Sequence, residues 1–310
     1  MIRTILLATA CLAVTAPAAL AQSHDSHAMA PAAAEHGHRH ADFESGRFHV
    51  RVEGSGPDVI LIPGLSSSPE VWDGTVAALG GHYRVHRIHI QGFAGAPAED
   101  NAEGPVAAPV AEDLARYIEE QGLEQPAVIG HSMGGTIALM LAARHPDLVG
   151  KLMVVDMVPF MGAMFGGPGA TPESLTPIAD QIYTGMATGP DAAYRAQLEG
   201  TISSMILTES KRAGPLEDGL TSDRQVSASA YRELIVTDLT PELGRITAPT
   251  EVVYVKFNDA RMTAEMTDGI YAAGYSNLPG VTLKRIDDSA HFIMLDQPDR
   301  FVAEVEAFLQ

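Results

Sequence analysis

The chain has 310 residues, of which 46% are hydrophobic and 19% are charged, so it has the composition of a globular protein with a sizeable core. Its formal net charge is −19, from 20 basic and 39 acidic side chains. Such a surface repels nucleic acid and anionic membranes, so neither is expected as a partner. The charge does not argue against a neutral small molecule held in a pocket.

The first 21 residues have the pattern of a secretory signal peptide. A basic start, Met1-Ile2-Arg3, precedes an apolar stretch over 4–20 and an Ala-x-Ala site that ends at Ala21. We therefore expect cleavage near Ala21 and a periplasmic or secreted protein; a membrane anchor and a lipoprotein signal at Cys11 are the less favoured alternatives. Cys11 is the only cysteine, so the mature chain would have no thiol, which excludes disulfides and cysteine catalysis.

Residues 22–45 are predicted to be a disordered linker, because they are rich in alanine and histidine and have no apolar period. His36, His38 and His40 alternate there, and neutral imidazoles bind transition metals. No catalytic metal spacing surrounds them. A solvated tail is therefore favoured over a metal site, and no metal is predicted for the chemistry.

From residue 48 onward, strand-like and helix-like segments alternate. The predicted strands are 48–52, 58–62, 83–90, 127–129, 152–155, 251–255 and 281–286. The predicted helices are 68–79, 106–121, the segment after Ser132 up to Arg144, 264–273 and 298–309. This alternation predicts an α/β fold, a mostly parallel sheet flanked by helices, formed by residues 46–158 and 245–310.

Between residues 159 and 244 the alternation stops, and helix-like segments are separated by glycine-proline breaks. This segment is predicted to be a helical cap, or lid, inserted into the α/β core. It contains Met161, Met164, Met186 and Met205. Packing beneath the cap is the favoured interpretation of these methionines over direct substrate contact, because methionine is a general gap-filler.

The most informative motif is Gly130-His131-Ser132-Met133-Gly134, which lies between the apolar run 126–129 and a strongly helical segment. In a nucleophile elbow the serine occupies a tight strand-to-helix turn, and the glycines on either side remove side chains that would collide with neighbouring elements. The helix N-terminus also favours developing negative charge. Ser132 is therefore the predicted nucleophile.

A serine nucleophile needs a histidine base, which in turn needs a carboxylate to orient it. In this type of fold the chain order is Ser, acid, His, and His291 is the only histidine beyond His145. Asp259, in the loop after the strand 251–255, is the favoured acid, and Asp156, at the end of the strand 152–155, is the alternative. Asp287 and Asp288 lie too close in sequence to His291 to orient it easily.

Acyl transfer also needs two N–H groups directed at the oxyanion. The main-chain N–H of Met133, directly after the nucleophile, is one predicted donor. The other is expected after the strand 58–62, where we favour the N–H of Leu65 and where Gly64 allows a close approach of the backbone to a ligand.

Together these motifs resemble the α/β-hydrolase superfamily over about residues 48–310. The residues that carry the resemblance are Ile62-Pro63-Gly64-Leu65, Trp72, Gln91-Gly92-Phe93-Ala94-Gly95, Gly130-His131-Ser132-Met133-Gly134-Gly135, Asn258-Asp259, Ser289-Ala290-His291-Phe292 and Asp296-Gln297-Pro298. The resemblance implies an eight-stranded core, a lid inserted after the sixth strand, and a triad of Ser132, Asp259 and His291 without a cofactor.

The serine at the elbow argues against similar dehalogenases and epoxide hydrolases, which need a carboxylate nucleophile. We therefore expect an exported serine esterase that acts on small to medium hydrophobic esters through an acyl-enzyme. Lactonase, carbon–carbon bond hydrolase, perhydrolase and acyltransferase activities of the same superfamily are the alternatives, because the fold cannot separate them. A non-catalytic ligand-binding protein is a further alternative from another class.

Overall fold

The computed structural model describes residues 43–167, 169–257, 259 and 261–310. The predicted signal peptide and all but the last three residues of the predicted linker lie outside these residues, and so do His36, His38 and His40. Within the described ranges, no helix has both the length and the apolar character needed to cross a membrane.

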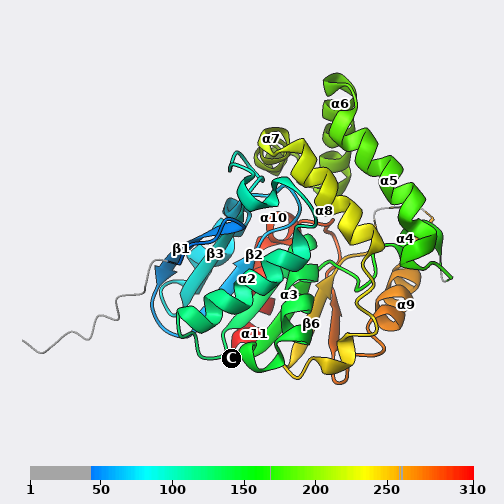
Figure 1. Cartoon of the computed structure of the whole chain (residues 1–310). Helices are drawn as coiled ribbons and strands as arrows, with labels where there is room; N and C mark the ends of the chain where they lie inside the picture. The colour runs from blue at the N-terminus through cyan, green and yellow to red at the C-terminus, as the bar shows by residue number, and fades with distance from the viewer. Residues whose placement is uncertain (1–42, 168, 258, 260) are drawn as a thin grey trace, which may run out of the picture. The chain divides into compact units, whose positions relative to one another are not determined.

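One sheet forms the centre of the described chain, and its strands run in the order β1-β3-β2-β4-β5-β6-β7 (Figure 1). β1 pairs antiparallel with β3, and the other neighbours pair in parallel. The strands are β1 (Phe48–Gly54), β2 (Asp58–Ile62), β3 (Arg84–Ile90), β4 (Ala127–His131), β5 (Lys151–Val155), β6 (Thr250–Tyr254) and β7 (Thr282–Arg285). The central strands are short and almost continuously apolar because helices cover both of their faces.

Helices pack on both faces of this sheet and bury a separate apolar cluster on each. One cluster takes side chains from α2 (Ala107–Glu120), α3 (Met133–Arg144) and α9 (Ala264–Gly274). The other takes side chains from α1 (Asp73–Leu79), α10 (Ile293–Asp296) and α11 (Pro298–Leu309). In Figure 1, α2 and α3 lie in front of the sheet. Both faces are therefore closed to solvent, and the carboxyl edge of the parallel strands is left for a site.

The structure confirms the predicted α/β class and corrects two details of it. The described residues contain seven strands in the sheet, not the eight implied by the resemblance, because a single strand, β1, precedes the buried β2. Counted over the described strands, the helical insertion consequently follows the fifth, β5, and not the sixth. The helix predicted over 68–79 is divided into a 3-10 turn, Pro69–Trp72, and α1.

Residues 159–244, here called the cap segment, contain no strand among their described residues. Their helices are α4 (Ala163–Gly166), α5 (Pro172–Thr188), α6 (Asp191–Met205), α7 (Ala213–Thr221) and α8 (Arg224–Val236). Figure 1 shows α5 and α6 projecting beyond the sheet.

A buried carboxylate attaches α8 to the sheet-flanking helices. Glu233 of α8 accepts hydrogen bonds from the main-chain N–H groups of Val106, Ala107 and Ala108, at 2.6, 2.7 and 2.9 Å. These N–H groups begin α2 and have no acceptor inside the helix, and the helix dipole favours a negative charge there. α8 is therefore fixed to the core at a defined position.

Candidate active site

Ser132 lies in the turn between β4 and α3, in the strained conformation expected of a nucleophile elbow. Its backbone angles are φ 54° and ψ −122°, which a residue other than glycine rarely adopts. Its N–H donates to the carbonyl of Val155 at 2.9 Å, which fixes the turn against β5. The side chain is half-buried and faces the cavity described below.

The two glycines of the motif are required by close backbone contacts. A Cβ on Gly130 would lie 2.1 Å from the Gly134 carbonyl oxygen, and a Cβ on Gly134 would lie 2.3 Å from the Ile62 carbonyl oxygen. Both neighbours are backbone atoms, which cannot swing aside as the end of a flexible side chain can. A side chain at either position would therefore disturb the tight strand-to-helix turn.

His291 lies in the loop after β7, and two contacts connect this loop to the end of α6. The Phe292 N–H donates to the carbonyl of Met205 at 3.1 Å. The Asp296 carboxylate accepts from the N–H of Ala290 at 2.9 Å and from the N–H of Leu207 at 3.0 Å. The loop that carries the histidine is thus held by the cap segment.

The carboxylate next to His291 is that of Asp156. The His291 Nδ1 lies 2.6 Å from Asp156 Oδ2, and the Asp156 side chain is only 6% exposed. Asp156 directly follows β5 with φ 50°, and its N–H donates to the Val253 carbonyl of β6 at 2.8 Å. This left-handed turn keeps the carboxylate at the carboxyl edge of the central strands, beside the elbow.

The sequence-based choice of Asp259 as the acid is corrected by this geometry. The Asp259 carboxylate accepts hydrogen bonds from the Nε and N–H groups of Arg261, two residues further along an exposed loop, with a shortest distance of 2.6 Å. The Arg261 guanidinium lowers the pKa of Asp259 to about 2. Asp259 lines the cavity, but its carboxylate is paired with Arg261, whereas the Nδ1 of His291 is paired with Asp156.

His131, which the sequence analysis did not assign a role, is packed against His291. Its Nε2–H donates to the His291 carbonyl at 3.0 Å, and the two rings lie 4.6 Å apart. The pKa of His131 lies well below its usual value, mainly because the ring is completely buried and, to a smaller extent, because His291 is close by. A neutral His131 with its proton on Nε2 therefore supports the backbone of the loop that carries His291. The only feature of the sequence that could have indicated this role is the position of His131 next to Ser132.

The two predicted oxyanion donors belong to segments next to the serine. Leu65 is in the loop after β2, and Met133 is the first residue of α3. Among the described residues neither N–H donates a main-chain or side-chain hydrogen bond. For Met133 this is usual, because the first N–H groups of a helix have no acceptor within it. A Cβ on Gly64 would lie 3.1 Å from the Ser132 Cβ, so this loop passes directly beside the nucleophile.

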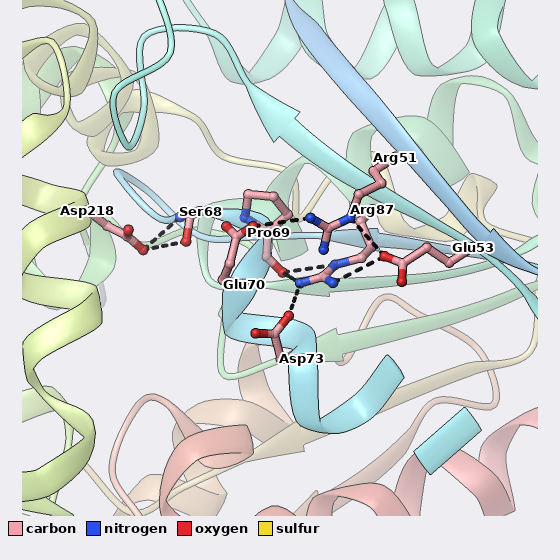
Figure 2. A network of polar contacts seen from close by, with 8 residues as sticks. All are labelled: Arg51, Glu53, Ser68, Pro69, Glu70, Asp73, Arg87 and Asp218. Atoms are coloured by element: carbon pink, nitrogen blue, oxygen red, sulfur yellow. Dashed lines mark hydrogen bonds and ion pairs between the residues drawn. The ribbon is translucent and has the colours of Figure 1, made fainter. Parts of the chain in front are cut away.

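A polar network fixes the loop that carries Leu65 (Figure 2). The Asp218 carboxylate of α7 accepts from the N–H of Ser68 at 2.9 Å and from its hydroxyl at 2.7 Å. On the other side, the buried guanidinium of Arg87 donates to the Pro69 carbonyl and pairs with Glu53. Because Asp218 belongs to the cap segment, the loop is held from the cap and from the sheet at once.

A cavity of about 610 Å³ opens onto Ser132 and His291, beneath the cap segment. Its volume lies within the range usual for small-molecule sites, roughly 300–1,000 Å³. Met161, Met164, Met186 and Met205 all line it, although packing beneath the cap was the favoured prediction. Among its described lining residues there is no lysine or arginine, and the acidic members are Asp156 and Asp259.

No metal site accompanies this arrangement in the part of the chain that the structure describes. No three histidine, cysteine, aspartate or glutamate side chains are grouped there so that they could hold an ion. A serine, a histidine and a buried carboxylate thus lie beside one cavity.

The fold and this site define a hydrolase of the α/β class. The model of the alpha/beta hydrolase family matches residues 59–304, and the chain belongs to that family. A pimeloyl-[acyl-carrier protein] methyl ester esterase of Vibrio cholerae is 26% identical over 262 residues, or 84% of this chain and 94% of that protein. A protein of the same name from Pectobacterium carotovorum is 25% identical over 84% of this chain and 97% of its own length.

Solved structures agree on the fold. An enol-lactonase from Burkholderia xenovorans has a TM-score of 0.67 at 21% identity and covers 84% of this chain and 96% of its own. An esterase from Exiguobacterium antarcticum has a TM-score of 0.68 at 21% identity and covers 84% of this chain and 95% of its own. These likenesses support the arrangement of the sheet and helices.

Proposed function

We propose that this protein is a carboxylic ester hydrolase that uses Ser132, His291 and Asp156 as a catalytic triad. The observation that carries the proposal is the 2.6 Å contact between His291 Nδ1 and the buried Asp156 carboxylate, in a cavity that also contains the strained Ser132. The esterase names of its relatives agree with it.

In the proposed mechanism, the Asp156 carboxylate accepts the Nδ1 proton of His291 in a hydrogen bond, so that Nε2 is free to act as a base. His291 takes the Ser132 proton while Oγ attacks the ester carbonyl, and the N–H groups of Leu65 and Met133 stabilise the oxyanion. His291 then protonates the departing alcohol. Water, deprotonated by His291, releases the acid from Ser132 and restores the enzyme.

We further propose that the substrate is an ester whose acyl and alcohol groups are uncharged and apolar. The cavity wall consists mainly of methionine, leucine, isoleucine and aromatic side chains, and its charged members are carboxylates. A carboxylate on the substrate would lose its hydration without gaining a cationic partner, which costs several kcal/mol. This cost separates neutral esters from half-esters of dicarboxylic acids.

Two substrate series test this specificity with the purified chain. Hydrolysis of p-nitrophenyl esters is expected to increase from acetate to medium acyl chains and then to decrease as the cavity fills; lack of activity at every length would contradict the proposal. Methyl hexanoate is expected to exceed monomethyl adipate in kcat/KM by at least about tenfold, which corresponds to 1.4 kcal/mol. Equal values, or a preference for the half-ester, would contradict the neutral-substrate proposal. Lactones of the same carbon number, tested alongside, separate an esterase from a lactonase.

We also propose that the protein is exported, on the basis of the signal-peptide pattern of residues 1–21. Expressed from its full gene in a Gram-negative host, the protein is expected in the periplasmic or extracellular fraction with Gln22 as its first residue. N-terminal sequencing of each cell fraction measures this. An intact N-terminus in the cytoplasmic fraction would contradict export.

A further inference from the structure

The carboxylate of Asp156 is surrounded by three donors, of which only one is His291. While Oδ2 faces His291, Oδ1 accepts from the Tyr271 hydroxyl at 2.9 Å and from the Val255 N–H at 3.1 Å. Tyr271 is 1% exposed and lies 115 residues further along the chain, on α9. Both carboxylate oxygens are therefore occupied, and the side chain has a single favoured orientation.

The Tyr271 ring packs against two other tyrosine rings. It stacks on Tyr254 with ring centroids 4.0 Å apart, and Tyr275 lies parallel to it at 6.4 Å. Burial, together with the neighbouring Asp156, raises the pKa of Tyr271 well above its usual value. Tyr271 is therefore protonated throughout the range in which an esterase is assayed, and it acts as a donor.

We propose that Tyr271 is a positioning residue of the active site, which orients the Asp156 carboxylate so that Oδ2 faces His291. This inference rests on the proposed triad. The O–H dipole presents its positive end to the carboxylate, so removing this donor leaves the negative charge of Asp156 less compensated beside His291. A phenylalanine at this position keeps the ring packing and removes only the donor.

Two further tyrosines, Tyr254 and Tyr275, pack against the Tyr271 ring. The Tyr275 hydroxyl donates to the Met157 carbonyl at 2.6 Å, and not to the Asp156 carboxylate. The remaining neighbours on these elements are Tyr254, whose hydroxyl donates to Asp268, and Arg285, which pairs with Asp268.

Tyr275→Phe is the matched control. Tyr275 directly follows α9, and its replacement also removes one buried hydroxyl and one hydrogen bond, but it leaves all donors to Asp156 in place. The rate at which a fluorophosphonate labels Ser132 is measured across pH for the wild type and both variants. In this reaction the serine oxygen bonds to phosphorus, fluoride leaves, and the serine proton passes to His291. Ester turnover is measured in parallel.

For Tyr271→Phe we expect labelling and kcat/KM to fall about tenfold, a difference of 1.4 kcal/mol. We also expect the acid limb of both profiles to move to higher pH by about half a unit or more. Tyr275→Phe is expected to leave the acid limb in place. In the Asp156→Asn background, Tyr271→Phe is expected to change the labelling rate less than about twofold, since the two residues act through one contact.

An unchanged acid limb in Tyr271→Phe, or an equal shift in Tyr275→Phe, would overturn the positioning role and leave a structural one. The two proposals fail separately. If Ser132 is labelled but no ester is turned over, the esterase proposal fails, while the labelling profiles still decide the role of Tyr271. If esters are hydrolysed and only the Tyr271 shift is missing, the positioning proposal alone fails.

Discussion

Replacement of Ser132 by alanine is expected to reduce kcat/KM for a short p-nitrophenyl ester by about 10⁵- to 10⁶-fold, because the covalent path is lost. The residual rate would come from the oxyanion donors and from substrate binding. The same change is expected to alter the free energy of unfolding little, since alanine keeps the Cβ of serine and has to adopt the same φ of 54°. Initial-rate kinetics and thermal unfolding measure the two effects.

Ser204→Ala is a suitable control for this prediction, because Ser204 also lines the cavity but lies on α6, in the cap segment. It is expected to change kcat/KM by less than about tenfold, as a contact with bound substrate would. Full activity in Ser132→Ala would refute the proposed mechanism. A large loss of activity in both variants would indicate that the shape of the cavity, and not a nucleophile at position 132, accounts for the effect.

Replacement of Asp156 by asparagine is expected to reduce kcat by about 10⁴-fold. The asparagine keeps the size of the side chain, but it cannot stabilise the imidazolium, and its amide favours the wrong tautomer of His291. KM is expected to change little, since the Asp156 side chain is almost entirely buried against His291 and Tyr271 and contributes little surface to the substrate.

Asp259→Asn is the matched control, because the same chemical change is made to the other aspartate of the cavity wall. Its carboxylate is paired with Arg261 on an exposed loop, so we expect kcat within about threefold of the wild type. If Asp259→Asn lost activity and Asp156→Asn retained it, the assignment of the acid would be reversed, and the loop after β6 would have to rearrange in solution.

The elbow and the histidine could be predicted from the sequence because their signals are local. Gly130 and Gly134 have to lack side chains for contacts within the turn, and His291 has no competitor after the last strand. The strands could equally be predicted from the sequence, since buried parallel strands are short apolar runs. Their observed ends lie within two residues of the predicted ones.

The choice between the two aspartates could not be predicted from the sequence in the same way. Asp156 and Asp259 both follow a strand that ends at the carboxyl edge of the sheet, so spacing alone cannot rank them. The decision depends on the left-handed turn at Asp156 and on its hydrogen bonds to Val255 and Tyr271, which are contacts between distant parts of the chain. The one local signal was that Asp156 follows its strand directly, whereas Asp259 lies beyond a loop.

The walls of the cavity were also beyond prediction from the sequence. Methionines with helical spacing fit a packed cap and a substrate pocket equally well, and only the structure places Met161 and Met205 on the cavity wall. The connection of Asp218 to Ser68 likewise joins segments 150 residues apart, and the sequence contains no motif for it.

The proton on His291 Nδ1 reports directly on the pairing of His291 with Asp156. In proton NMR, an imidazole N–H held by a carboxylate at 2.6 Å is expected to give a resonance well downfield of the amide region. We predict that this resonance is present in the wild type and in Asp259→Asn and absent in Asp156→Asn. Its loss in Asp259→Asn together with its persistence in Asp156→Asn would show that Asp259, and not Asp156, holds the His291 imidazole.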